Sequence, residues 1–547
     1  MARSILAAAL FAAFSNACFA QAAQELEAQG QRAYEAKQYA QSAALYQQAW
    51  QREPNAALQY NAACSHALAG DVEQAFRALL LAVEGGYRNV EHMERDGDLA
   101  VLRRDARWAP LVAEAKEKQA FDARLFDSPA LASPYRENLG EDEKVAGLSK
   151  FWSEVKYNFV YVDKLREIDW DRLYLETIPK VRATTSTAEY YRVLMELCAK
   201  LQDGHTNVYP GEELRRTTMA RPLLQTQLVE GKVLVRAVQD PALLAKGIAP
   251  GAEILEVDGE PVIAYVEREL VPVISASTPQ DMVRRAYGYS FLSGRLDKAP
   301  TVLFRLANGK TVALEVRRVD PETYAKTLPQ TPPFELRKLP GNVAHVALNS
   351  FGDRRAADAW LAAFEQIKES SAVIIDVRNN GGGNSDVGYK VLATLTDKPF
   401  ETGRWSTRQY VPTYRAWNRA MPDLNKPHKP WAPDGARHYT GPVALLTSSG
   451  TYSAAEDFTV AFASMKRGPI VGEATGGSTG QPLFISLPGG GVARICTKAD
   501  TFPDGRAWVG HGIQPDIKAA PRVKDLRGGG DTVLAAALAA LKPHMEE

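Results

Sequence analysis

The sequence predicts a multidomain α+β protein with helical segments first, a β-rich segment in the middle and an alternating α/β segment last. Its 547 residues exceed what one hydrophobic core normally serves. Residues 24–119 are rich in Ala, Leu, Glu and Gln, whereas residues 221–318 are rich in β-branched side chains. After residue 339, short apolar runs alternate with stretches of helical periodicity, which is typical of a buried parallel sheet covered by helices.

The composition is that of an ordinary globular protein. Apolar residues make up 45% and charged residues 24% of the chain, and Lys plus Arg equals Asp plus Glu at 65 each. Because no net charge dominates, we expect neither nucleic acid nor an anionic membrane surface as a partner.

The first twenty residues have the pattern of a secretory signal peptide. Arg3 precedes an apolar run over residues 5–14, and the small-residue pattern Cys18-Phe19-Ala20 follows. Residues 1–20 therefore predict export to the periplasm or beyond. A lipoprotein is disfavoured because Ser15-Asn16-Ala17 lacks the aliphatic residue that usually precedes a lipidated cysteine. No later apolar run reaches the roughly 18 residues of a membrane span, so we expect no integral membrane segment.

Three cysteines follow this segment, and their spacing indicates neither a metal site nor a disulfide framework. We expect all three to be small buried apolar residues. They are Cys64, Cys198 and Cys496.

Residues 24–119 partly repeat at an offset of 34 residues, for example Gly30 with Cys64 and Ala33 with Ala67. Paired helices with this period resemble the tetratricopeptide repeat, which implies a surface that could recruit a partner protein. A plain helical hairpin is the alternative. Residues 120–143 contain Pro129 and Pro134 without periodicity and predict a linker.

Residues 144–212 predict a second helical block that ends at the sequence Asp203-Gly204-His205-Thr206. We expect Gly204 to stop the last helix by adopting a positive φ. His205 would then lie in a loop directly after a helix.

Residues 221–318 resemble a PDZ domain of the kind that protease families carry. Residues 247–262 read Gly-Ile-Ala-Pro-Gly-Ala-Glu-Ile-Leu-Glu-Val-Asp-Gly-Glu-Pro-Val, a Pro-Gly turn, a buried strand and an Asp-Gly hairpin turn. The resemblance implies that this domain binds protein C-termini by adding a strand to a sheet edge. A helical piece near residues 279–294 interrupts it.

Residues 339–520 contain the motifs that indicate chemistry. Polar, glycine-rich loops follow two predicted strands, at Asp376–Ser385 and Thr447–Asp457, and Gly512-Ile513-Gln514-Pro515-Asp516-Ile517 closes the segment. In this order the motifs resemble the C-terminal processing protease family, whose relatives include the tricorn protease core. The resemblance covers about residues 145–520 and implies peptide-bond hydrolysis on a crotonase-like layered core, with no metal or cofactor. Residues 521–547 predict a C-terminal helix.

Ser453 is the predicted nucleophile. It lies where a strand meets a helix, so that the backbone amide of Ala454 would point at an incoming carbonyl oxygen. Glycines 381–383 would allow a second amide to approach, and the resemblance assigns Gly382 to this oxyanion hole. The alternative role of Ser453 is a helix N-cap. Glu456 is expected to brace the helix, and the competing hydroxyls are those of Ser448, Ser449 and Thr451.

The general base divides the family into two branches. One branch uses a lysine about twenty-five residues after the serine, but Ser478 stands at that position here. The tricorn-like branch uses a histidine from the helical block, which corresponds to His205, and imidazole titrates near neutral pH. His511 is the second choice.

The third catalytic member is less clearly marked. The glutamate that commonly precedes the closing motif is missing from Trp508-Val509-Gly510-His511. Glu473 is the predicted replacement, and Asp203 is the second choice.

The sequence therefore predicts a serine endopeptidase that acts on unfolded or C-terminally presented proteins in the cell envelope. Two alternatives remain open: an inactive peptide-binding scaffold built from the repeat and PDZ-like modules, and a carrier of apolar ligands on the same core fold. Nothing in the sequence indicates an oligomeric state.

Overall fold

The computed structural model describes residues 23, 25–425 and 430–545. The chain divides into two compact units, Met1–Pro129 and Ala130–Glu547, and the short turn η3 (Pro129–Leu131) spans the division. The predicted signal peptide, residues 1–20, lies outside the described residues.

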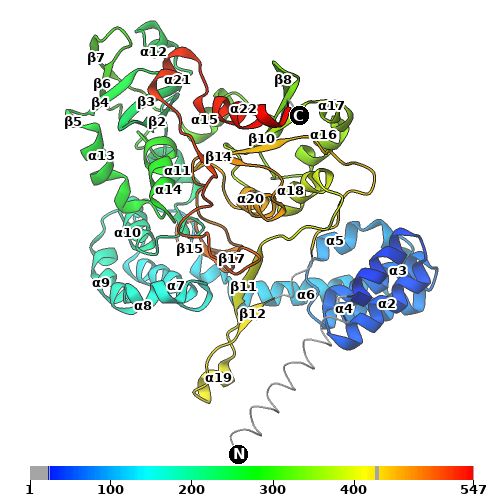
Figure 1. Cartoon of the computed structure of the whole chain (residues 1–547). Helices are drawn as coiled ribbons and strands as arrows, with labels where there is room; N and C mark the ends of the chain where they lie inside the picture. Colours follow the sequence, from blue (N-terminus) through cyan, green and yellow to red (C-terminus); the bar gives the residue numbers. More distant parts are fainter. Residues whose placement is uncertain (1–22, 24, 426–429, 546–547) are drawn as a thin grey trace, which may run out of the picture. The chain divides into compact units, whose positions relative to one another are not determined.

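Helices make up the N-terminal unit (Figure 1). A first helical stretch covers residues 25–35, and α3 then packs between α2 and α4 in an Ala-rich core. Asn55 and Asp71 cap α3 and α4 by accepting hydrogen bonds from first-turn amides. Pairing of successive helices is compatible with the tetratricopeptide interpretation, which stays a prediction. The named elements are α2 (Tyr39–Arg52), α3 (Ala56–Leu68), α4 (Val72–Glu84), α5 (Val90–Arg95), η1 (Gly97–Leu99), η2 (Leu102–Arg104) and α6 (Trp108–Phe126).

Helix α6 runs seven residues past the predicted end of the helical region at 119, so the linker is shorter than expected. Residues 120–126, Ala-Phe-Asp-Ala-Arg-Leu-Phe, contain neither Gly nor Pro, and nothing breaks the helix before Pro129. The next helix begins at Glu141, just before the predicted boundary at 144.

The helical block of the second unit shares its core with strands from the far end of the chain. Side chains of α7 and α10 pack against Ile485, Leu487 and Ile495. Strand β1 follows the block and pairs antiparallel with β16, which also pairs with β15. The elements are α7 (Glu141–Asn158), α8 (Val162–Glu167), α9 (Trp170–Ala183), α10 (Thr187–Ala199), β1 (Asn207–Tyr209), α11 (Glu212–Thr218), β15 (Pro482–Leu487) and β16 (Gly491–Cys496).

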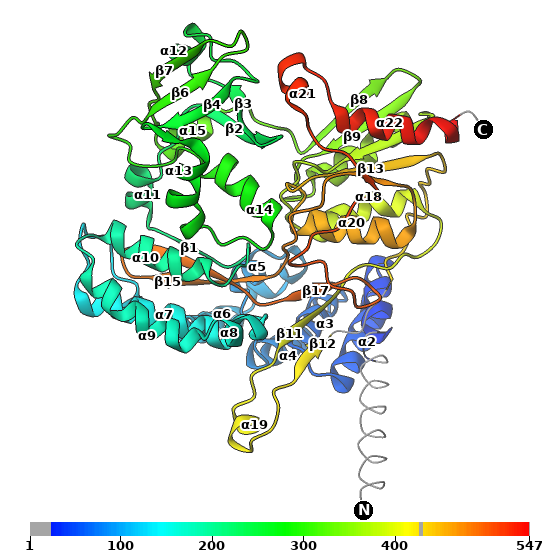
Figure 2. The same cartoon turned by 60° about the vertical axis from the view of Figure 1, so that its left-hand side comes forward.

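The segment predicted as PDZ-like folds as a separate sheet with its own core (Figure 2). The strand order is β2-β3-β4-β6-β7, with β5 paired to β4, so β2 is an edge strand. The predicted helical interruption is α14 followed by a π-helical turn, η5. The elements are β2 (Leu224–Val229), β3 (Lys232–Val238), α12 (Pro241–Ala245), β4 (Glu253–Val257), β5 (Glu260–Pro261), α13 (Val262–Glu269), η4 (Val271–Val273), α14 (Pro279–Arg284), η5 (Arg285–Tyr289), β6 (Thr301–Arg305), β7 (Thr311–Glu315) and α15 (Pro321–Thr327).

The core is a six-stranded sheet of order β18-β14-β13-β10-β9-β8, parallel except for the edge strand β8. Val373 and Ile375 face α16, α18 and α20, whereas the alternate residues Ala372 and Ile374 face α22. Helices thus cover both faces (Figure 1). The elements are β8 (Phe334–Leu339), β9 (Val343–Leu348), α16 (Arg355–Ala362), α17 (Phe364–Lys368), β10 (Ala372–Asp376), α18 (Ser385–Leu392), η6 (Ala393–Leu395), β13 (Val443–Thr447), α20 (Ala454–Met465), β14 (Ile470–Gly472), β18 (Ile517–Lys518) and α22 (Thr532–Met545).

The remaining elements lie beside this core. A small sheet has the order β12-β11-β17. The predicted single C-terminal helix over 521–547 is wrong, because Gly529, at a φ of 70°, separates α21 from α22. The elements are β11 (Arg404–Arg408), α19 (Pro412–Ala416), β12 (Asp423–Asn425), β17 (Ala499–Thr501) and α21 (Val523–Gly528).

The helices and the cysteines bear on two expectations from the sequence, a chain without a membrane span and buried free thiols. In the parts of the chain that the structure describes, none of the helices combines the length and apolarity needed to cross a bilayer. Cys64, Cys198 and Cys496 are buried and free, which confirms the expectation that they are packing residues.

Phe458 tests the packing of α20 against the sheet. Its side chain is fully buried and contacts Phe351 at a ring-centroid distance of 5.7 Å. We expect Phe458→Ala to lower the free energy of unfolding of the second unit by about 3–5 kcal/mol, because it leaves a cavity. Phe484→Ala is the control, since that ring is 61% exposed, and should change it by less than about 0.5 kcal/mol. Urea unfolding measures both, and equal effects would contradict this packing.

Candidate active site

Ser453 occupies the sharp turn between the loop after β13 and the start of α20. Its backbone has a φ of 56° and a ψ of −125°, a region that residues with a side chain rarely adopt. Such a conformation costs on the order of 1–3 kcal/mol and persists only where its surroundings enforce it. Strand-to-helix turns of this kind present a serine hydroxyl above a sheet. The side chain is partly exposed, so it is accessible to a substrate.

His205 reaches Ser453 through the pairing of β1 with β16. It lies between α10 and β1, and β1 aligns with β16 so that Asn207 faces Arg494. Figure 2 shows β1 and β15 beside α10. The Nε2 atom of His205 lies 3.3 Å from the Oγ of Ser453. The structure thus brings together two predicted residues that are far apart in the sequence.

Gly204 serves a purpose other than the predicted one. The left-handed residue in this loop is Gln202, with a φ of 48°, and Gly204 does not have a positive φ. Instead, a Cβ at Gly204 would overlap the Tyr452 hydroxyl and would lie 2.7 Å from Asp281 Oδ2. The glycine is therefore required for the close approach of the loops that contain His205 and Tyr452.

The other ring nitrogen of His205 contacts Ser478. The Nδ1 atom lies 2.8 Å from Ser478 Oγ, and the Ser478 side chain is fully buried. The Ser478 carbonyl also accepts a hydrogen bond from the Ser453 amide at 3.2 Å. In the sequence, Ser478 only marked the absence of a lysine. The signal that could have revealed its role was its position, because the residue that replaces a catalytic lysine must lie close to the nucleophile.

Glu456 fixes the positions of Ser453 and Ser478 through hydrogen bonds. Its buried carboxylate accepts four hydrogen bonds, which join the first turn of α20 to the loop after β14. Burial raises the pKa of Glu456 to about 8, and the donors oppose this rise because they favour the charged form. The donors are the amides of Ser453 (3.2 Å), Gly477 (2.8 Å) and Ser478 (3.0 Å) and the hydroxyl of Thr475 (2.6 Å).

Glu473 is not the partner of His205 in this structure, which corrects the expectation. Its side chain lines a separate cavity, and burial raises its pKa while Arg284 and Arg378 act in the opposite direction. Glu473 is kept away from His205 by its position at the end of a strand. It directly follows β14, and its amide donates a hydrogen bond to the carbonyl of Thr447. The loop therefore passes Glu473 before it turns toward His205 at Ser478.

The lower-ranked candidates for the catalytic roles have different partners. Asp203, second choice after Glu473, is buried and accepts from Thr206 Oγ1 at 2.6 Å. His511 is exposed, and its carbonyl accepts from Gln280. Of the competing hydroxyls, Ser448 and Thr451 donate to the carbonyls of Arg378 and Val377, and Ser449 lines the separate cavity.

The two amides predicted to form an oxyanion hole differ in their hydrogen bonding. The Ala454 amide begins α20 and makes no hydrogen bond within the described residues. The Gly382 amide, in contrast, donates to Asn380 Oδ1 at 2.9 Å and is already engaged. Gly382, at a φ of 97°, is needed for space instead, because a Cβ there would lie 2.7 Å from the Cβ of Ser453.

Electrostatics keep the His205 ring neutral. Burial lowers its pKa well below the usual value, and the positive charges of Arg494, Arg285 and Lys498 lower it further. Neutral imidazole is the form that can accept a proton.

A brace of three side chains fixes the ring. The rings of His205 and Tyr452 are stacked, with centroids 5.2 Å apart. Arg285 donates to the Tyr452 hydroxyl at 2.8 Å and to the Gly204 carbonyl at 3.2 Å, and Asp281 in turn pairs with Arg285 at 2.7 Å.

The side chains that could approach a metal ion together lie in the N-terminal unit. Among the described residues, these are Cys64, Asp96 and Asp98. Tyr60 and Tyr34 donate to the two carboxylates, and burial raises the pKa of the Cys64 thiol. A protonated thiol and two engaged carboxylates make a poor metal site.

Comparison with known proteins agrees with the geometry. Residues 342–519 match the model of peptidase family S41. The "Probable CtpA-like serine protease" of Staphylococcus haemolyticus is 25% identical over 274 residues, 49% of this chain and 52% of that protein. The chloroplastic C-terminal processing peptidase of Tetradesmus obliquus is 30% identical over 190 residues, 34% of this chain and 37% of that protein. The family match includes Ser453 but not His205, and the two relatives are named as a serine protease and a C-terminal processing peptidase.

The extent of these similarities is limited to part of each protein. The chain spans about half the length of the staphylococcal relative. The structure of mature CPAF complexed with lactacystin superimposes with a TM-score of 0.60 at 16% identity, covering 74% of this chain and 99% of that chain. At this identity the likeness concerns the fold.

The protonation of His205 can be measured directly. We expect its imidazole to titrate with a midpoint below 6.5, the ordinary value, because burial and three cations disfavour the charged form. Selective ¹³Cε1-histidine labelling with NMR detection measures this, and loss of one resonance in His205→Gln assigns it. A midpoint at or above 6.5 would contradict the described environment.

Proposed function

We propose that the protein is a serine endopeptidase in which Ser453 is the nucleophile and His205 the general base. The observation that carries this proposal is the 3.3 Å contact between His205 Nε2 and Ser453 Oγ at a strained strand-to-helix turn. The similarity of residues 342–519 to family S41 supports the role of Ser453, which lies within this segment.

The reaction proceeds through an acyl-enzyme. Ser453 Oγ forms a bond to the scissile carbonyl carbon while its proton passes to His205 Nε2. The Ala454 amide donates to the developing oxyanion; the second donor is an amide of the 381–383 loop that becomes available on substrate binding. The protonated ring then gives its proton to the leaving amine as the C–N bond breaks. Water, deprotonated by His205, releases the acyl group and restores the Ser453 hydroxyl.

Ser478 takes the positioning role for which Glu473 was predicted. With its proton on Nδ1, the His205 ring donates to Ser478 Oγ, which leaves Nε2 free to accept from Ser453. A neutral hydroxyl orients the ring but does not neutralise the imidazolium that forms. We therefore infer a weaker base than one paired with a carboxylate.

The substrates are proteins or peptides that can enter as extended chains. We propose that the PDZ-like segment, residues 221–318, presents unfolded or C-terminal segments through the edge strand β2. The helical N-terminal unit offers a surface for a partner protein. Export to the cell envelope rests on the sequence of residues 1–20.

An inactive scaffold and a carrier of apolar ligands have less support. Neither role needs a strained serine or a neutral buried histidine in contact with it. The observation that favours a scaffold is that, in the described part of the chain, His205 Nδ1 contacts a hydroxyl and not a carboxylate. Turnover decides between these functions.

Hydrolysis of an unfolded protein tests the proposal. We expect Ser453→Ala and His205→Ala to lower the rate of casein cleavage by the mature chain about a thousandfold or more, since both remove a reacting group. Ser464→Ala is the matched control on the same helix, because among the described residues its hydroxyl bonds only to the Val460 carbonyl, at 2.8 Å. Full turnover by Ser453→Ala would exclude this mechanism.

The two candidate third members can be separated in the same assay. We expect Ser478→Ala to lower kcat about tenfold, the cost of one neutral hydrogen bond. Glu473→Gln should leave kcat on an uncharged substrate within about twofold, because its side chain does not face His205. The reverse order of effects would restore Glu473 as the third member.

A further inference from the structure

Arg378, in the loop after β10, is held by carboxylates from two distant parts of the chain. Its guanidinium donates to Asp376 from Nε at 3.0 Å and from Nη2 at 2.6 Å. It also donates to Asp531, from Nη1 and from Nη2 at 2.9 Å each. A planar guanidinium that meets two carboxylates through paired hydrogen bonds has a defined position and orientation. Arg378 therefore joins the end of a core strand to the start of the last helix, α22.

Asp531 is itself held in place by α22. Its Oδ1 atom accepts the amide of Leu534 at 2.9 Å, so that Asp531 caps the helix. The helix packs on the core sheet through buried side chains that include Val533 and Ala537. Because this packing fixes the first turn of α22, the carboxylate that meets Arg378 has a fixed position relative to the sheet.

Asp376, the other partner of Arg378, is ionised although it is buried. Burial favours the neutral acid, but hydrogen bonds from His345, at 3.0 Å, and from Arg378 outweigh this effect and hold the pKa of Asp376 below its ordinary value. The link from Asp376 through Arg378 to Asp531 is therefore made of charged groups at neutral pH.

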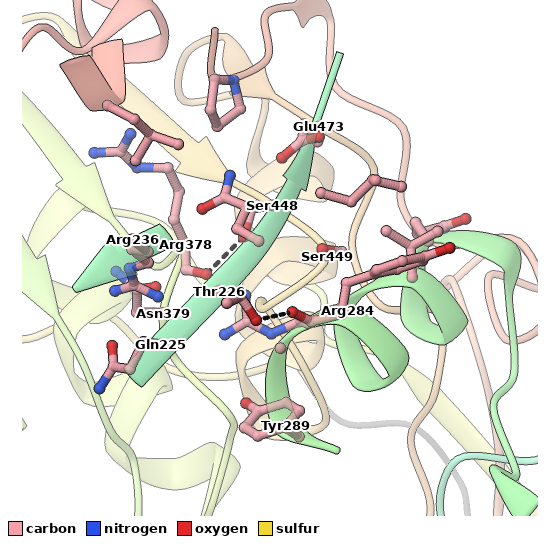
Figure 3. A pocket seen from close by; sticks show the side chains of 18 of the residues that line it. Gln225, Thr226, Arg236, Arg284, Tyr289, Arg378, Asn379, Ser448, Ser449 and Glu473 are labelled. Carbon is pink, nitrogen blue, oxygen red and sulfur yellow. Dashed lines mark hydrogen bonds between the residues drawn. The ribbon is translucent and has the colours of Figure 1, made fainter. Parts of the chain in front are cut away.

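The backbone of Arg378 lies directly against the nucleophile loop, residues 448–452. Its carbonyl accepts from Ser448 Oγ at 2.6 Å, and Figure 3 shows these two residues together. A Cβ at Gly450 would lie 2.5 Å from the same carbonyl oxygen, so there is no room for a side chain between the loops. A displacement of Arg378 would therefore disturb the loop that leads to Ser453.

The oxyanion loop, residues 379–383, begins directly after Arg378. Its first part is fixed, because the Tyr452 amide donates to the Asn380 carbonyl at 3.0 Å. In the proposed mechanism its glycines shift, since the Gly382 amide is bound to Asn380 Oδ1 before substrate arrives. A loop that shifts and still places a donor about 2.7–3.1 Å from an oxyanion needs one fixed end. Arg378 lies at that end.

The link can be altered without opening the hydrophobic core. Arg378 and Asp531 both line the separate cavity, which has a volume of about 950 Å³ (Figure 3). The side chain of Asp531 is 36% exposed. Asparagine caps helices as well as aspartate does, so Asp531→Asn keeps the start of α22 and weakens only the contact with Arg378.

We propose that Arg378 and Asp531 are positioning residues of the oxyanion hole. Together they hold the oxyanion loop at the distance from Ser453 that the transition state requires, and so make turnover dependent on the last helix of the chain. Displacement of such a donor by about 1 Å is enough to slow a reaction up to a hundredfold. The assignment rests on the proposed peptidase function.

Steady-state kinetics on the full chain test this role. The substrate is a fluorogenic peptide that spans a bond cleaved in casein. We expect Asp531→Asn to lower kcat about tenfold with KM within about twofold, because the oxyanion exists only in the transition state. The Ki of the peptide aldehyde that ends at the residue before this bond should rise by about the same factor, since its adduct with Ser453 places an oxygen in the oxyanion hole.

Asp525→Asn is the matched control in the same segment. Asp525 accepts from the Thr532 hydroxyl at 2.9 Å and the Arg522 amide at 2.9 Å, and among the described residues it forms no ion pair or hydrogen bond with Arg378. The chemical change is identical, so any effect of α22 packing alone would appear here too. We expect kcat and Ki within about twofold of the wild-type values.

A second substitution shows whether Asp531 acts through Arg378. Arg378→Lys keeps the positive charge but cannot meet two carboxylates in paired hydrogen bonds. We expect it to lower kcat about tenfold or more, and adding Asp531→Asn to it should change kcat by no more than about twofold. Independent effects that multiply in the double variant would exclude a shared role.

Hydrogen–deuterium exchange measures the loop without relying on turnover. We expect the amides of residues 379–383 to exchange about threefold or more faster in Asp531→Asn than in the wild type or Asp525→Asn. Unchanged exchange, an equal loss of kcat in Asp525→Asn, or a loss confined to KM would overturn the proposal. If the wild-type chain cleaves no protein, the proposed function fails, and exchange alone decides whether the two residues hold the loop.

Discussion

The site depends on one buried carboxylate, that of Glu456. It receives the amides of Ser453, Gly477 and Ser478 and the hydroxyl of Thr475, so a single side chain fixes the first turn of α20 against the loop after β14. The same contact joins Ser453, which has a positive φ, to Ser478, which lies beside His205. Without this carboxylate, the buried amides of Gly477 and Ser478 would lose their acceptor, at a cost of about 1–3 kcal/mol each.

The second constraint is that His205, the proposed general base, lies outside the core sheet. His205 belongs to a helical block whose hydrophobic core includes Ile485 and Ile495 from the β15–β16 hairpin. Ser478 lies just before β15, and His205 lies just before β1. Because β1 pairs with the β15–β16 hairpin, folding of the hairpin onto β1 brings these two residues together. The contact between His205 and Ser453 is therefore coupled to the packing of the helical block, which forms no part of the α/β layers.

Much of the core could be predicted because its signals are local. The two strands predicted to precede the polar, glycine-rich loops are β10 and β13, and the helix expected directly after Ser453 is α20. The partner of His205 Nδ1 could not be predicted in this way. Glu473 and Ser478 belong to the same loop, and only its path past the end of β14 decides that the hydroxyl, not the carboxylate, meets a ring from residue 205. Likewise, the engagement of the Gly382 amide by Asn380 depends on a side-chain rotamer that no spacing reveals.

The central claim is that Ser453 is a nucleophile activated by His205, and its most direct test is covalent labelling with a fluorophosphonate followed by peptide mapping. A serine oxygen activated in this way displaces fluoride and forms a stable bond to phosphorus. The account predicts a single modified serine, Ser453, in the wild-type chain, with labelling slowed strongly in His205→Ala and unchanged in Ser464→Ala. Modification at another serine, or equal labelling of wild type and His205→Ala, would contradict it.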